Sequence, residues 1–86
     1  MTREEFYRKA TNFIIDQVKV KPAEILPNTP LIINGIMDSL MVTEMIIFVE
    51  NIIGRNIDID DFKVDSLESL ERIYDGLIAP ALSEAA

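Results

Sequence analysis

The sequence predicts an all-α fold, a four-helix bundle with three main helices, one short helix and a long first loop. Apolar side chains recur with the helical period in three segments of the chain. Capping residues precede these segments, and proline or glycine follows each of them. The chain has 86 residues, 49% of them hydrophobic, which suffices for one packed core and no second one. Residues 1–86 are therefore expected to form a single domain.

The first helix is expected over residues 3–19. Thr2 followed by Glu5 is a capping-box pattern that opens a helix, and Pro22 prevents its continuation. Ile15 lies among the polar residues of this segment. The other large apolar side chains share one face, which should pack on the core: Phe6, Tyr7, Ala10, Phe13, Ile14 and Val18.

A long connection follows the first helix and runs to Gly35. Pro22, Pro27 and Pro30 mark it as a loop. We expect its apolar side chains to tuck the loop onto the helices: Ile25, Leu26, Leu31, Ile32 and Ile33. A connection of this length in so small a domain is often functional.

The second helix is expected from Ser39 to Ile53, because Asp38 is a good N-cap and Gly54 stops the helical pattern. Its apolar arc should face the core: Met41, Val42, Met45, Ile46, Phe48, Val49, Ile52 and Ile53. The short segment 60–64 can form at most a brief helical turn.

The last helix is expected from residue 66 to about residue 78. Asp65 and Glu68 form a second capping-box pattern before it, and Pro80 with the alanine-rich tail should end it. Six apolar side chains would share its buried face: Leu67, Leu70, Ile73, Tyr74, Leu77 and Ile78.

The composition argues against an enzyme. The chain has no histidine, which removes the usual general base near neutral pH and the commonest metal ligand. It has no cysteine, and so no thiol nucleophile, thiolate metal site or disulfide. The acidic run at 58–61 does not fit a calcium loop, because Lys63 and Ser69 stand where glycine and glutamate are needed. We therefore expect no catalytic residue and no bound metal.

Charge is distributed unevenly along the chain. Residues 1–21 hold five basic and three acidic side chains, whereas residues 22–86 hold three basic and twelve acidic ones. Such acidity repels nucleic acid and anionic lipid and attracts basic protein partners, although it can also serve solubility alone. The most apolar stretch, 45–49, ends at Glu50, too early to span a bilayer, and the charged first residues do not resemble a signal peptide. We expect a cytoplasmic protein without membrane insertion.

The residues that carry chemistry are Gly35-Ile36-Met37-Asp38-Ser39-Leu40, where the long loop enters the second helix. A phosphate ester on Ser39 would be stabilised by free backbone N–H groups and by the positive end of the helix dipole. Gly35 permits backbone angles that other residues resist and so opens the loop to an enzyme. Asp38 and Ser39 could also be ordinary capping residues. A second copy, Asp65-Ser66-Leu67, lacks the upstream glycine and the presenting loop.

With this motif in a helical frame of this length and acidity, the chain resembles the acyl carrier protein family, including its aminoacyl and peptidyl carrier relatives. In that family the serine of Asp-Ser-Leu receives 4′-phosphopantetheine from coenzyme A, and here that serine is Ser39. The resemblance implies that Gly35, Asp38 and Leu40 form its motif context and that the fold is an acyl-carrier-like bundle. It also implies a monomer that carries a thioester and meets a phosphopantetheinyl transferase, an acyl- or aminoacyl-activating ligase and an acceptor enzyme.

The outer face of the second helix is a candidate partner-binding surface. Ile47 is an apolar residue framed by Glu44 and Glu50, an arrangement that would dock on a basic partner. In carrier proteins this face is the recognition surface, although one exposed isoleucine is ordinary in any protein. Leu40, the other apolar residue on this side, is expected to be covered by the loop.

Met41, Asn51 and Ile52 occupy positions where carrier proteins often have Asp or Glu. This departure favours a discrete carrier with dedicated partners, in secondary metabolism or amino-acid transfer. The alternative is an unmodified helical adaptor that binds proteins non-covalently, with Ser39 as a mere cap. A hydrolase using Ser39 is disfavoured, because no histidine could activate the hydroxyl.

Overall fold

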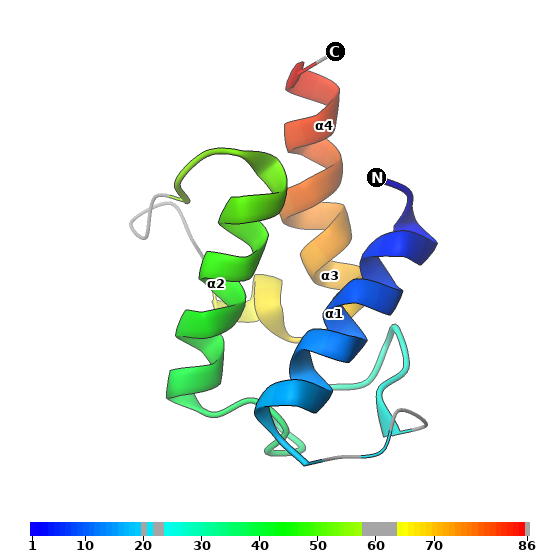
Figure 1. Ribbon diagram of the computed structural model, residues 1–86, viewed down its shortest axis with the longest axis vertical. Helices are drawn as coiled ribbons and strands as arrows, with labels where there is room; N and C mark the ends of the chain where they lie inside the picture. Colours follow the sequence, from blue (N-terminus) through cyan, green and yellow to red (C-terminus); the bar gives the residue numbers. More distant parts are fainter. Residues whose placement is uncertain (20, 22–23, 58–63, 86) are drawn as a thin grey trace.

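The computed structural model describes residues 1–19, 21, 24–57 and 64–85, and within these ranges the protein is helical and contains no strand (Figure 1). This confirms the predicted fold class, three main helices with a short helical turn. The elements in chain order are α1 (Arg3–Gln17), α2 (Ser39–Ile53), the 3-10 turn η3 (Val64–Leu67), α3 (Leu70–Ile73), the π-helical segment η4 (Tyr74–Ile78) and α4 (Ala79–Ala85).

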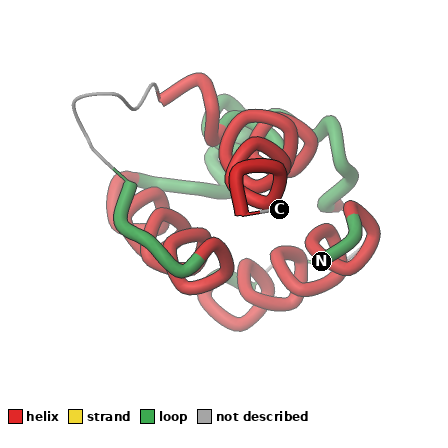
Figure 2. Tube along the Cα trace, turned by 90° about the horizontal axis from the view of Figure 1, so that it is seen from above, coloured by secondary structure: helices red, strands yellow, loops and turns green. Residues whose placement is uncertain are grey.

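The helices are arranged around a common core. The last helical stretch, from α3 to α4, packs beside both α1 and α2, as the view from above shows (Figure 2). The C-terminal end of α4 lies at one end of the molecule, whereas Met1 lies beside η4, where its carbonyl accepts a hydrogen bond from the Tyr74 hydroxyl (Figure 1). The C-terminal end of α1 and the N-terminal end of α2 lie at the opposite end, and this is where the Asp-Ser-Leu motif enters α2.

The first helix begins as the capping residue predicts. The Thr2 hydroxyl accepts a hydrogen bond from the backbone N–H of Glu5 at 3.2 Å. The helix ends at Gln17, slightly before the predicted end at residue 19, because Val18 adopts an extended conformation. The predicted apolar face is the buried one, with Phe6, Ala10 and Ile14 fully enclosed. Ile15 is half-buried and also packs on the core.

The second helix has the predicted bounds, Ser39–Ile53. The Asp38 carboxylate accepts a hydrogen bond from the N–H of Met41 at 2.9 Å. Gly54 ends the helix with a φ of 75°, a left-handed conformation that suits glycine. The side chains that α2 buries fully belong to the predicted arc: Met41, Met45 and Val49.

The predicted start of the last helix is wrong. Its regular turns begin at Leu70, and the cap is Ser69, whose hydroxyl accepts from the N–H of Arg72 at 3.2 Å. Asp65 lies instead in the short turn η3. The physical reason is the first loop, which bonds to this segment through two backbone contacts: Leu31 N–H to the Glu68 carbonyl at 2.7 Å and Glu71 N–H to the Pro27 carbonyl at 2.9 Å.

The predicted end of the last helix is also wrong, because the helix continues through Pro80 to Ala85. Proline has no N–H, and its ring crowds the carbonyl of the residue four positions earlier, here Gly76. We attribute the wider π-helical turn over Tyr74–Ile78 to this conflict. At its end the Ala79 N–H donates to the Tyr74 carbonyl.

Two of the loop's apolar side chains do not tuck onto the helices as predicted. Ile25 and Leu31 are buried and Ile32 is half-buried, but Leu26 is 55% exposed and Ile33 is 80% exposed. The core that results includes residues of α1, the first loop, α2, η3, α3 and η4: Phe6, Ala10, Ile14, Ile25, Leu31, Met37, Met41, Met45, Val49, Leu67, Leu70, Ile73 and Ile78.

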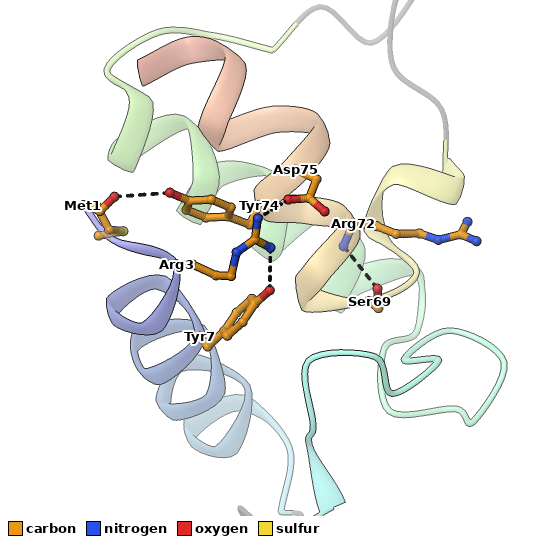
Figure 3. Close-up of polar contacts among 7 residues, drawn as sticks. All are labelled: Met1, Arg3, Tyr7, Ser69, Arg72, Tyr74 and Asp75. Atoms are coloured by element: carbon orange, nitrogen blue, oxygen red, sulfur yellow. Dashed lines mark hydrogen bonds and ion pairs between the residues drawn. The ribbon is translucent and has the colours of Figure 1, made fainter. Parts of the chain in front are cut away.

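A polar cluster joins the start of α1 to the π-helical segment (Figure 3). The Arg3 guanidinium donates to the Tyr7 hydroxyl at 2.9 Å and to the Asp75 carboxylate at 2.6 Å. Its Cζ lies 4.7 Å from the centre of the Tyr74 ring, a cation–π distance. The hydrogen bonds to Tyr7 and Asp75 raise the pKa of Arg3 above its ordinary value.

Candidate modification site

The loop reaches Ser39 through a turn whose two ends are buried. Leu31 and Met37 both lie in the core, and the Met37 N–H closes the turn on the Leu31 carbonyl at 3.0 Å. Gly35 has a φ of 77°, and a methyl group added there would meet nothing within 4 Å. The turn therefore needs glycine for its left-handed backbone and not for space.

Ser39 is the first residue of α2, and its side chain is exposed. Two N–H groups of the first turn are already bound by Asp38. Its carboxylate accepts from the Met41 N–H, and its backbone carbonyl accepts from the Val42 N–H. The N–H groups of Ser39 and Leu40 are left without an acceptor in the described part of the chain. An exposed hydroxyl thus stands beside free donors at the positive end of a 15-residue helix, a setting that favours a phosphate ester.

The second Asp-Ser-Leu copy has a different setting. Ser66 lies in the short turn η3, is half-buried and precedes the fully buried Leu67. Its hydroxyl oxygen lies 4.0 Å from where a Cβ on Gly76 would be. Ser66 therefore packs toward the π-helical segment, and it lacks the exposed helix N-terminus that Ser39 has.

The prediction that the loop covers Leu40 is wrong. It is 69% exposed, and Ile33 at the tip of the preceding turn is still more exposed. The reason is that Leu31 and Met37 hold the two ends of the turn in the core, so its tip projects outward. Ser39 is therefore flanked by apolar surface, a feature that the helical periodicity did not reveal.

The three candidate partner-binding residues of α2 lie in different surroundings. Ile47 is 48% exposed, as the helical periodicity predicts. The carboxylate of Glu50 accepts a hydrogen bond from the backbone N–H of Ile57 at 2.8 Å, so this residue also holds the segment that follows α2. Glu44 is half-buried on the side of α2 that faces α1.

A groove separates the C-terminal end of α1 from the N-terminal end of α2. Its volume of about 90 Å³ is well below the roughly 300–1,000 Å³ of a site for a whole small-molecule ligand. We call it the α1–α2 groove, and it is lined by Gln17, Val18, Asp38, Leu40, Met41 and Glu44.

The described residues include no group of three or more His, Cys, Asp or Glu side chains that could hold a metal ion. The acidic run at 58–61 lies outside the described residues. No helix in the described ranges has the length and apolar character needed to cross a membrane.

Fold and site define a small all-α protein that presents one serine at a helix N-terminus. No family model matches the chain, and searches of curated proteins and of solved structures return no match either. What Ser39 does must therefore follow from its own geometry.

Proposed function

We propose that the protein is a discrete acyl or aminoacyl carrier in which Ser39 holds a 4′-phosphopantetheine arm. The observation that carries this proposal is the exposure of the Ser39 hydroxyl at the start of α2, after a turn anchored in the core at Leu31 and Met37. The same tripeptide at Ser66 is half-buried in a short turn, so only one of the two copies is presented.

The residues around Ser39 fit a phosphate ester. The free N–H groups of Ser39 and Leu40 can donate to phosphate oxygens. The Asp38 carboxylate lies close by and accepts from the N–H of Met41. The free N–H groups and the helix dipole have to outweigh its repulsion of the phosphate. Attachment joins the Ser39 oxygen to the pantetheine-bearing phosphorus of the coenzyme A diphosphate and breaks the bond from that phosphorus to the bridging oxygen. Adenosine 3′,5′-bisphosphate leaves, and the hydroxyl proton passes to a base of the transferase. When bound, the arm supplies the thiol that carries the acyl or aminoacyl group.

The chain itself contributes presentation and recognition. A tethered intermediate meets each docked enzyme at a high effective concentration, which requires no catalytic group on the carrier. The partners we propose are a phosphopantetheinyl transferase, an acyl- or aminoacyl-activating ligase and an acceptor enzyme. Their docking surfaces would be basic, because the region from residue 22 onward carries twelve acidic and three basic side chains. We propose a cytoplasmic monomer whose docking face centres on Ile47, with Glu50 beside it and Glu44 at the edge toward α1.

The alternative is an unmodified adaptor that binds protein partners non-covalently. The exposed apolar side chains of Ile33, Leu40 and Ile47 favour it, because such surface serves any protein partner. Intact mass spectrometry separates the two functions. After incubation with coenzyme A and a phosphopantetheinyl transferase, a carrier gains the mass of one phosphopantetheine group. A folded protein that gains no mass with transferases of broad specificity would contradict the carrier function and leave the adaptor.

A further inference from the structure

We propose that the α1–α2 groove holds the middle of the pantetheine arm against the protein while no partner enzyme is docked. This inference rests on the attachment at Ser39 proposed above. It assigns a resting place to the arm on the side of α2 that faces α1.

The position of the groove relative to Ser39 supports this assignment. Asp38 and Leu40, the residues on either side of Ser39, both line the groove. Glu44 lines it further along α2, and Gln17 and Val18 face it from the end of α1. These two helix ends lie at the same end of the molecule (Figure 1). An arm on Ser39 therefore starts at the rim of the groove.

The chemistry of the lining selects a neutral chain. Val18, Leu40 and Met41 supply an apolar wall, and Leu40 keeps most of its surface exposed beside the groove. Asp38 and Glu44 supply carboxylate acceptors, and none of the lining residues within the described ranges is basic. Such a site repels anions and accepts amide N–H and hydroxyl donors. Pantetheine has two amides, a hydroxyl and two geminal methyl groups in its middle, and its phosphate remains outside at the N-terminus of α2.

The size of the groove sets how the arm is held. An open groove of about 90 Å³ can enclose a stretch of a linear chain and cannot enclose a whole arm with its cargo. The contacts are consequently weak, but tethering at Ser39 supplies the effective concentration that populates them. An enzyme that binds the thiol end can draw the arm out at little cost, so the groove restrains an idle arm without blocking transfer.

Nuclear Overhauser effects on the holo-protein test the proposal, once intact mass has confirmed the arm on Ser39. The geminal methyl protons of the arm should give cross-peaks to the methyl groups of Val18, Leu40 and Met41. Gln17→Trp should fill the groove from the exposed end of α1, keep the mass gain and lose these cross-peaks. Asn12→Trp places the same bulk at an exposed position of α1 outside the groove and should keep both.

The outcomes separate this inference from the proposed function. A mass gain without any cross-peak to the groove would show that the arm stays in solvent, and would overturn the inference alone. Cross-peaks that persist unchanged in Gln17→Trp would show that the arm reaches these methyl groups without entering the groove, with the same consequence. A folded protein with no mass gain at Ser39 would overturn the carrier function, and the groove assignment with it.

Discussion

At the level of single residues, Ser39 and Ser66 each lie in a copy of the same tripeptide, Asp-Ser-Leu, but in different local structures. Ser39 begins a 15-residue helix, whereas Ser66 lies inside a four-residue 3-10 turn packed toward Gly76. The sequence distinguishes them through the upstream Gly35 and the long loop. It does not reveal the burial of Ser66, because that depends on how η3 packs against the last helix.

The two serines give the first prediction. Ser39→Ala should abolish the coenzyme-A-dependent mass gain, because it removes the only hydroxyl presented in this motif. Ser66→Ala should gain the full mass of the arm, because Ser66 is half-buried in η3 and the variant leaves Ser39 in place. Intact mass spectrometry after transferase treatment measures both. Loss of the gain in Ser66→Ala alone would mean that the wrong copy has been assigned.

The second prediction concerns Gly35. Its φ of 77° is unfavourable for any residue with a Cβ, so Gly35→Ala should lower the free energy of unfolding by about 1 kcal/mol. Gly76→Ala is the matched control. Gly76 has no left-handed φ and its added methyl would make only an ordinary contact, so that variant should be unchanged or slightly more stable. Urea unfolding measures both, and equal stability of the two variants would argue against the left-handed turn.

At the level of elements, the accuracy of the sequence-based boundaries follows from local chemistry. The bounds of α2 were predicted because Asp38 and Gly54 act within one turn of the residues they cap. The start of the last helix was not predicted correctly, because Asp65 and Ser69 are both plausible caps. The choice between them depends on backbone bonds from Leu31 and to Pro27, which are distant in sequence.

The candidate site was predictable to a similar extent. The capping role of Asp38 and the exposure of Ile47 follow from pattern and periodicity. The exposure of Leu40 and the bond between Glu50 and the Ile57 N–H depend on the paths of two loops, which periodicity does not encode. The α1–α2 groove was missed for the same reason, since its two sides come from different helices.

The third prediction concerns the outer face of α2. Ile47→Ala should weaken binding of a partner enzyme by roughly 1–2 kcal/mol, because it removes an exposed apolar anchor. The domain should keep its thermal midpoint. Met45→Ala is the control, because Met45 is fully buried in the same helix and its truncation should cost about 2–5 kcal/mol of stability. Titration of each variant against the transferase, with paired thermal melts, measures both effects.

The acidic neighbours of Ile47 should respond differently from each other. Glu44→Lys should mainly slow association with a basic partner, and the effect should shrink as salt screens the charge. Glu50→Lys should also lower stability, because it removes the acceptor of the Ile57 N–H.

An Ile47→Ala variant that melts as early as Met45→Ala would show that Ile47 belongs to the core.

The fourth prediction concerns Pro80, to which we attribute the π-helical segment. Pro80→Ala restores an N–H and removes the ring from the carbonyl of Gly76. It should raise the free energy of unfolding by about 1–3 kcal/mol. Chemical denaturation measures the change. A less stable variant would mean that Tyr74–Ile78 keeps its wide turn for another reason, such as the contacts of Tyr74 and Asp75 with Arg3.

At the level of the whole molecule, the core is built from the buried faces of α1, α2 and the last helical stretch, with Leu31 and Met37 from the loop. No metal-ligating cluster occurs among the described residues. The fifth prediction is that a chelator leaves the thermal midpoint within about one degree, because only a ligand of the native state shifts stability by mass action. A large drop would reveal an ion held by the acidic run at 58–61.

The C-terminal end of α4 lies at one end of the molecule, and the N-terminal end of α2 lies at the other (Figure 1). This matters for engineering fusions. An enzyme joined beyond α4 starts on the far side from Ser39, across a molecule whose longest dimension is 35 Å. A flexible glycine–serine linker has a root-mean-square span of about 5–6 Å times the square root of its length, so covering that distance takes about 40 residues. A shorter linker would reach Ser39 only when stretched beyond its root-mean-square span, while an affinity tag at the C-terminal end would leave the serine open to modification.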